Sequence, residues 1–225
     1  MALRLLLPLL LLAQPLFAAD RQMRYDIHLG ALKVGQLGLA ADETARDYAV
    51  TARFRDAGLM AALVNIRFAA TVQGKVQDTR FRPLRYEEDI DTGRRQSRVR
   101  LAYDNGHPQV VTYEPSAPLL IRLADQHGTL DPLSVLYTLL RDSPQPCATT
   151  LNLFDGRRRS AVTLSEMQDL TCQGRYSRIA GFSAEEMAER RTFPFTLHYA
   201  RQDGTYRLIA AEIETLWGTA RLTPR

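Results

Sequence analysis

Apolar and polar residues alternate along most of the chain. Clear runs of this kind occupy residues 25–29, 48–54, 66–76 and 193–199. Alternation with a period of two is typical of strands that bury one face and expose the other, as antiparallel sheets allow. Turn-forming sequences stand between such runs, at Gly30-Ala31, Asp104-Asn105-Gly106, Asp155-Gly156 and Asp203-Gly204. The pattern predicts a mainly β protein made of antiparallel strands.

Two segments have helical spacing instead. The first begins with a capping Asp131 and Pro132, continues with apolar residues at helical intervals, and predicts a helix over residues 131–142. The second begins at Asp56 and has Leu59, Met60, Leu63 and Val64 on one side. Both are short and apolar on one face, so we expect each to lie on the sheet as a lid or plug. A sheet of many strands with only two small helices has to curl over its own apolar face, which predicts a strongly curved antiparallel sheet, an open barrel or a spiral.

Residues 84–103 predict a hairpin in more detail. A two-residue turn at Thr92-Gly93, with a bulge as the alternative, places Leu84 opposite Leu101, Tyr86 opposite Val99, Glu87 opposite Arg98 and Asp91 opposite Arg94. A shift by one residue would set apolar against charged side chains. The arginine-rich run 94–100 is then mainly the solvated face of a hairpin, because exposed ion pairs contribute only about 0–1 kcal/mol and need no function.

The first 19 residues predict a cleavable secretion signal. They contain Arg4, a leucine-rich stretch and a small-residue exit at Ala18-Ala19. We expect residues 20–225 to form a single β-rich domain, because no linker, low-complexity tract or repeat divides them. Cysteine does not follow the signal, and no later stretch is long and apolar enough to span a bilayer. These features predict a soluble periplasmic protein that is not a lipoprotein.

The net charge of +4 comes almost entirely from arginine, since Lys33 and Lys75 are the only lysines. A bias of arginine over lysine reflects genome composition more often than a polyanion site. Together with the export signal, it gives no reason to expect nucleic-acid binding.

Cys147 and Cys172 are the only cysteines. In an oxidising compartment such a pair is expected to form a structural disulfide, and the spacing differs from the Cys-x-x-Cys of redox pairs. If Asp155-Gly156 turns a hairpin, a flat arrangement would place the two cysteines two strands apart, about 9.6 Å, which is too far for a disulfide. We therefore expect Cys147 to lie outside the regular ladder, in the connection that leaves the helix.

Catalytic motifs are scarce. The four histidines, His28, His107, His127 and His198, show no metal-ligand spacing, so we expect no metal site. Neither a Gly-x-Ser-x-Gly elbow nor a phosphate-binding loop occurs, and Gly181-Phe182-Ser183 lacks both the second glycine and a following helical pattern. No cofactor is implied. The candidate binding residues are Glu88, which the hairpin register turns toward the apolar face beside Ser97, and Arg157 with Arg159, which follow the Asp155-Gly156 turn.

An ordered set of motifs resembles the bacterial domain-of-unknown-function family 3108. The set covers nearly all of the chain after the signal, and its most specific elements are Asp131-Pro132-Leu133-Ser134-x-Leu136-Tyr137 and Phe154-Asp155-Gly156-Arg157-Arg158. The resemblance implies an exported, mainly β protein of Gram-negative bacteria without an assigned activity. Fold analogy alone adds a kinship with curled-sheet periplasmic proteins that carry lipidated clients or maintain the envelope.

Two classes of function follow from these features. The first is non-catalytic binding of an apolar or lipid-like ligand, or of a protein partner, in a groove of the curved sheet closed by the helices. The second is an envelope hydrolase or isomerase that uses Glu88 or a histidine. Binding of a polyanion through Arg157, Arg158 and Arg159 is a third possibility.

Overall fold

The computed structural model describes residues 19–56, 66–92, 96–116 and 118–225. One antiparallel sheet contains all thirteen strands: β1 (Ala19–Leu29), β2 (Leu32–Glu43), β3 (Asp47–Asp56), β4 (Arg67–Gln77), β5 (Arg80–Asp91), β6 (Gln96–Asp104), β7 (His107–Glu114), β8 (Thr149–Phe154), β9 (Arg159–Leu164), β10 (Thr171–Ala180), β11 (Thr192–Gln202), β12 (Thr205–Thr215) and β13 (Gly218–Pro224). The predicted signal segment lies outside the described residues, apart from Ala19.

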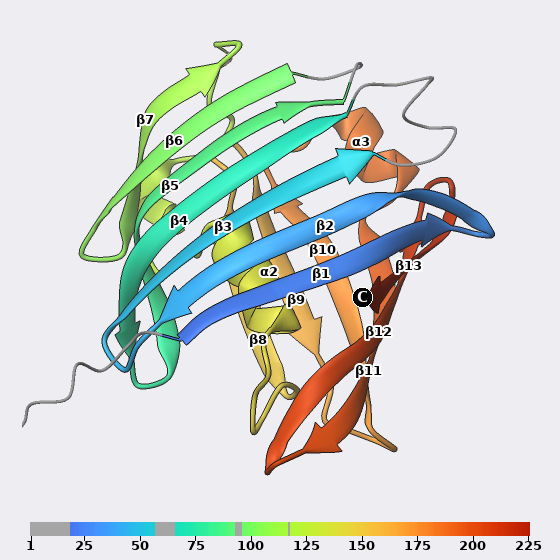
Figure 1. Ribbon diagram of the computed structural model, residues 1–225. Helices are drawn as coiled ribbons and strands as arrows, with labels where there is room; N and C mark the ends of the chain where they lie inside the picture. The colour runs from blue at the N-terminus through green and yellow to red at the C-terminus, as the bar shows by residue number, and fades with distance from the viewer. Residues whose placement is uncertain (1–18, 57–65, 93–95, 117) are drawn as a thin grey trace, which may run out of the picture.

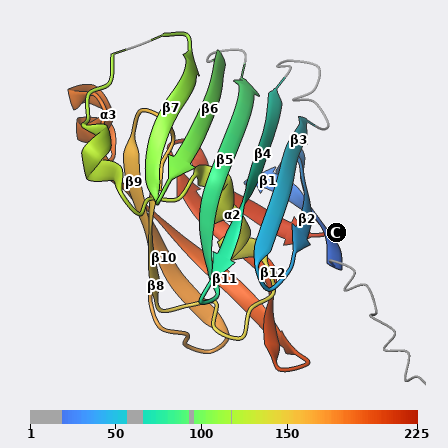
Figure 2. The same cartoon turned by 90° about the vertical axis from the view of Figure 1, so that its left-hand side faces the viewer.

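The sheet curls into a nearly closed barrel (Figure 1). Its strand order is β7-β6-β5-β4-β3-β2-β1-β13-β12-β11-β10-β9-β8, so β1 pairs with β13 and the two edges are β7 and β8. Tyr25 stands opposite Pro224 where β1 and β13 meet. The sheet is therefore open along one seam, between β7 and β8 (Figure 2). This arrangement confirms the strongly curved antiparallel sheet.

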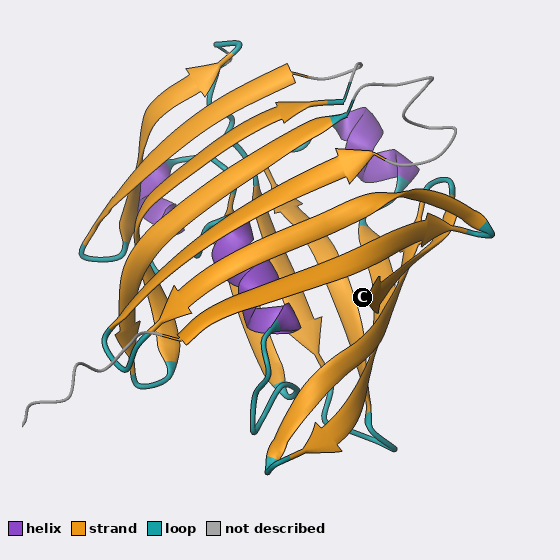
Figure 3. Cartoon of the chain, in the orientation of Figure 1, coloured by secondary structure: helices purple, strands orange, loops and turns teal. Residues whose placement is uncertain are grey.

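In the residues that the structure describes, the strands are accompanied by the 3₁₀-helix η1 (Leu123–Gln126), α2 (Pro132–Leu140) and α3 (Ala184–Glu189) (Figure 3). Helix α2 confirms the helix predicted over 131–142. The helix expected from Asp56 onward falls on residues 57–65, outside the described part of the chain. Among the described residues, no helix has both the length and the apolar character needed to cross a membrane.

Helix α3 corrects the sequence analysis, which expected no helix after Ser183. The Ser183 hydroxyl accepts a hydrogen bond from the Glu186 N–H, and the Glu186 carboxylate accepts one from the Ser183 N–H. This reciprocal capping box starts a helix without needing an apolar stripe, because none of the α3 residues is buried.

The β5–β6 hairpin has a different register from the predicted one. Tyr86 pairs with Leu101 instead of Val99, and Glu87 pairs with Arg100 instead of Arg98. The pair nearest to the turn is Asp91 with Gln96, and residues 93–95 lie outside the described part of the chain. A register shift of two residues leaves every side chain on its original face, and the alternation of the sequence cannot exclude it.

Leu84 does not share the apolar face with Tyr86, as the hairpin prediction required. The β4–β5 pairing shifts register between Gln73 and Gly74, which stand opposite Arg85 and Pro83, so Leu84 is an extra, bulged residue. The bulge turns the Leu84 side chain outward, where it is 44% exposed.

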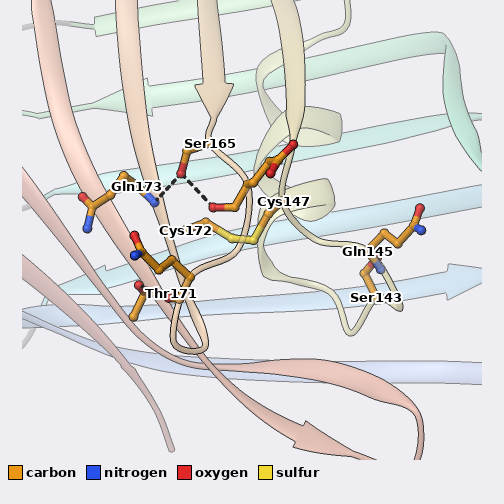
Figure 4. Close-up of a disulfide and its surroundings, with 9 residues drawn as sticks. Ser143, Gln145, Cys147, Ser165, Thr171, Cys172 and Gln173 are labelled. Carbon is orange, nitrogen blue, oxygen red and sulfur yellow. Dashed lines mark hydrogen bonds between the residues drawn. A yellow bond between two sulfur atoms is a disulfide. The ribbon is translucent and has the colours of Figure 1, made fainter.

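The disulfide joins the loop after α2 to β10 (Figure 4). Cys147 lies shortly before Thr149, the first residue of β8, and Cys172 lies on β10. Their Cα atoms are 5.9 Å apart. The prediction that Cys147 lies outside the regular ladder is confirmed. The bond therefore attaches the connection that leaves α2 to the wall of the barrel.

Candidate functional site

The inner face of the sheet is the candidate binding surface. Alternate residues of the strands bury apolar side chains there, among them Val50, Val72, Leu101, Leu164 and Leu197. Helix α2 lies inside the curve, against β3, β4, β5 and β8 (Figures 1 and 2). It contributes Leu133, Val135, Tyr137 and Leu140 to the same core, whereas Leu136 is only partly buried. A plug formed by the chain itself thus occupies the interior.

A chain of hydrogen bonds anchors the N-terminal end of α2. The carboxylate of Asp131 accepts a hydrogen bond from the Ser134 N–H at 2.9 Å and another from the Ser134 hydroxyl at 2.5 Å. The hydroxyls of Ser134 and Tyr48, on β3, lie 2.7 Å apart. Because the Ser134 proton is directed to Asp131, Tyr48 is the donor to Ser134.

Asp131 is fully buried. No cation within ion-pair distance compensates its charge among the described side chains, and burial raises the pKa of Asp131 to about 6. The pKa values of Tyr48, Tyr86 and Tyr103 are raised mainly by the burial of these side chains. The charge of Asp131 is one of the smaller causes that raise them further. The sequence marked Asp131 only as a helix cap, since a cap motif does not tell whether the helix begins at the surface or inside the fold.

Glu43 anchors the other end of α2. Its carboxylate accepts a hydrogen bond from the Tyr137 hydroxyl at 2.6 Å and forms an ion pair with Arg141. The Arg141 guanidinium also lies over the Phe81 ring, 4.5 Å from its centre. This pair was not detected in the sequence, because Glu43 and Arg141 are far apart along the chain.

Glu88 is half-buried on β5, and the Tyr86 hydroxyl donates a hydrogen bond to it at 2.6 Å. Its partner across the β5–β6 pair is Val99 instead of the expected Ser97. The structure also brings the β8–β9 turn to this region, because a Cβ on Gly156 would lie 2.9 Å from Val99. Gly156 has a φ of +95°, so both the backbone and the close approach require glycine.

Two of the three arginines after that turn bind neighbouring elements. Arg159 donates to the main-chain oxygen of Asp125 in η1, and Arg158 forms a 2.7 Å ion pair with Glu186 of α3. The Arg157 N–H donates to Asp155, within the turn. Arg158 and Arg159 thus attach the β8–β9 turn to α3 and η1, and anion binding by Arg157 and Arg159 stays a prediction.

The interior offers little for catalysis as it stands. Ser134 and Asp131 are 0% exposed, and the serine hydroxyl is bonded to a carboxylate instead of a histidine. The rings of His107 and His127 lie 4.4 Å apart, although they are separate in sequence. Within the described ranges, no three or more His, Cys, Asp or Glu side chains are grouped so that they could hold a metal ion.

Comparison with solved structures identifies a similar fold. A crystal structure titled a β-barrel-like protein of domain of unknown function DUF1849, from Brucella abortus, aligns with a TM-score of 0.50 and 11% sequence identity. The alignment covers 92% of this chain and 98% of that chain, and at this identity it shows the fold alone. No curated protein matches the sequence.

The family comparison agrees with the motifs and with the fold that they build. A profile described as "Protein of unknown function (DUF3108)" matches residues 24–174, from β1 to β10. This range includes α2, Asp131 and the three arginines at 157–159. The chain belongs to the DUF3108 family.

Proposed function

We propose that the protein is a non-catalytic, exported envelope protein that binds an apolar, lipid-like ligand on the inner face of its sheet. The observation that carries the proposal is the open seam beside an apolar inner face that a short helix of the chain itself covers. A curved antiparallel sheet of this kind is a natural container for an apolar ligand. A ligand would take the place of α2, and the disulfide would keep the displaced segment attached.

The buried carboxylate supports a helix that can be displaced. Near neutral pH, above its pKa of about 6, Asp131 is charged, and burying this charge costs free energy. When the N-terminal end of α2 leaves the interior, water solvates Asp131 and the cost is recovered. The predicted signal sequence and the disulfide support a periplasmic location, where a soluble carrier of lipid-like molecules would operate.

Mass spectrometry of the exported, mature protein provides the test. Organic extraction should release an apolar amphiphile in an amount comparable to that of the protein, and amide exchange over residues 132–140 should slow after the ligand is removed. The neutral probe N-phenyl-1-naphthylamine should then bind with saturation. Protein that carries no amphiphile and does not bind the probe would overturn the proposal.

Two matched tyrosine variants sharpen this test. Tyr48→Phe removes the donor to Ser134 and should increase probe binding, because it loosens the end of α2. Tyr103→Phe removes a buried hydroxyl that has no hydrogen-bond partner among the described residues, so it should leave probe binding unchanged. Equal probe binding by both variants and the wild type would show that the probe does not enter at α2.

A further inference from the structure

The outer face of β1, β2 and β3 contains a hollow of about 560 Å³. Its sides include the arginine side chains Arg24, Arg53, Arg55 and Arg225, and Gly38 lies at the floor between them. The strand register explains this placement: Gly38 stands opposite Arg24 on β1 and opposite Arg53 on β3. Because these residues point away from the core, the hollow is separate from the inner face and from the proposed ligand there.

The arginines of this hollow make no ion pair with a carboxylate of the described residues, although the charge of Arg225 acts on Asp26 from farther away. None of the four is within ion-pair distance of a carboxylate among the described side chains. Asp26 is the only acidic side chain among the described residues that line the hollow, and it is already bonded to Lys33 at 2.8 Å and to Gln36 at 3.0 Å. The hollow therefore has an excess of positive charge.

A second hollow, of about 480 Å³, adjoins the first across β3, and it contains arginines that are paired with carboxylates. Arg98 lies 3.6 Å from Asp89 and 3.9 Å from Glu114, and Arg100 lies 3.7 Å from Glu87. All five residues line this second hollow. Arg98 and Arg100 of the second hollow are thus paired with carboxylates, whereas Arg53, which lines both hollows, has no carboxylate within ion-pair distance among the described side chains.

Gly38 has no structural reason to be glycine. A Cβ added there would approach only the Arg53 carbonyl oxygen, at 3.9 Å, which is an ordinary contact. At Gly35 and Gly74, by contrast, a Cβ would lie 2.2 Å from Phe54 and 2.3 Å from the Arg82 carbonyl oxygen. A glycine inside a strand weakens it, but here the missing side chain leaves space between Arg24 and Arg53.

We propose that the hollow over β1–β3 binds a ligand with two or more phosphate groups. Guanidinium groups match phosphate oxygens in bidentate geometry, and each phosphate can bind two arginines. The volume of about 560 Å³ suits a small phosphorylated molecule or the headgroup of a phospholipid, within the usual range for ligand sites. Either source presents the same chemistry to the four arginines.

Calorimetry with inorganic pyrophosphate tests the proposal on the protein comprising residues 20–225. Binding at low salt should weaken about tenfold or more in the double variant Arg24→Gln with Arg53→Gln. The matched control, Arg98→Gln with Arg100→Gln, removes the same charge from the paired hollow and should change the affinity by less than about twofold. Equal losses of pyrophosphate affinity in the two double variants would indicate a general attraction of the anion to the positively charged protein, and would overturn the proposal.

Gly38 provides a second test that leaves every arginine in place. Gly38→Glu puts a carboxylate between Arg24 and Arg53 and should abolish pyrophosphate binding, whereas Gly38→Gln has the same size without the charge and should retain part of it. Equal affinity of Gly38→Glu and the wild type would contradict the proposal, and thermal melting of both variants checks that they fold.

Vesicles distinguish the two sources of phosphate. Retention on vesicles of phosphatidylglycerol in phosphatidylcholine, but not on pure phosphatidylcholine, with loss in Gly38→Glu, would assign the hollow to a lipid headgroup. Pyrophosphate binding without vesicle retention would assign it to a free phosphorylated molecule. If neither probe binds at low salt, the proposal fails, whatever the outcome of the tests on the inner face.

Discussion

The two ends of helix α2 are held inside the barrel in different ways. At the N-terminal end, the Asp131 carboxylate is bonded to Ser134, which is bonded to Tyr48, and no cation from the described part of the chain takes part. At the C-terminal end, the Glu43 carboxylate pairs with Arg141, and the chain soon reaches the disulfide at Cys147. Backbone bridges from Leu130 and Ser143 attach both flanks of the helix to strands, so they do not account for the difference.

The difference lies in how each buried charge is compensated. The Glu43 carboxylate has the attraction of a cation to offset burial, whereas the Asp131 carboxylate has only hydroxyl and amide donors, and burial disfavours its charged form. The C-terminal end is therefore a fixed attachment, and the N-terminal end is the one that responds to protonation. We expect movement of α2 to begin at Asp131 and to turn about the disulfide-linked end.

Of the variants that test this comparison, the one without the disulfide should lose the most stability. The double variant Cys147→Ser with Cys172→Ser releases a cross-link between residues 25 apart, which should lower the free energy of unfolding by about 3 kcal/mol. Chemical denaturation under oxidising conditions measures the loss. A non-reducing peptide map checks the wild type, and an unchanged transition midpoint would show that the bond does not attach this end.

Glu43→Ala should have the next largest effect. It leaves Arg141 without its counter-ion at a site where the two side chains are only 15% and 16% exposed, so we expect a loss of about 2–3 kcal/mol at pH 7. Asp142→Ala, which breaks a more exposed ion pair with Arg207, is the control and should cost less than about 1 kcal/mol. Similar losses in both variants would remove the distinction between the ends.

Asp131→Asn tests the response of the N-terminal end to pH. The pKa of Asp131 is raised from 3.8 to about 6 in the folded protein, so the folded state holds the proton more tightly than the unfolded chain. The contribution of Asp131 to the free energy of unfolding should therefore be greatest below pH 4. It should fall by about 2 kcal/mol as the pH rises from 4 to 6.

Asparagine does not titrate and still accepts the helix-capping hydrogen bond, so the decline assigned to Asp131 should disappear in the variant. Unfolding curves of both proteins at several pH values provide the measurement. Parallel pH profiles would show that the charge of Asp131 is not the cause.

Tyr48→Phe should have the smallest effect, about 1 kcal/mol, because it removes one buried hydrogen bond and leaves the Ser134 hydroxyl bonded to Asp131. Tyr103→Phe should cost nothing or stabilise the protein slightly, since its hydroxyl is buried without a partner among the described residues. Thermal melting of the pair is sufficient, and a reversed order would contradict the hydrogen-bond chain.

The sequence predicted the curved sheet, helix α2 and the position of Cys147 because each depends on local patterns or on simple strand spacing. It did not predict the β5–β6 register, since the faces of the strands are the same after a shift of two residues. Nor did it find the Asp131–Ser134–Tyr48 chain, because Tyr48 has the alternating pattern of any core strand residue and only the fold brings it to the helix. Nor did it predict the arginine-lined hollow, because Arg24 and Arg53 become neighbours of Gly38 only through the pairing of three strands.

The pairing of β1 with β13 has a consequence for how the protein folds. Every other neighbouring pair of strands in the sheet is also consecutive along the chain, so most of the sheet can assemble by local hairpin formation. The sheet cannot close between β1 and β13 until β13, the last strand along the chain, has been synthesised. A chain that enters a new compartment from its amino end would hold an unpaired β1 edge until the end of transit, and during that time a chaperone could bind it or a second copy could exchange strands with it.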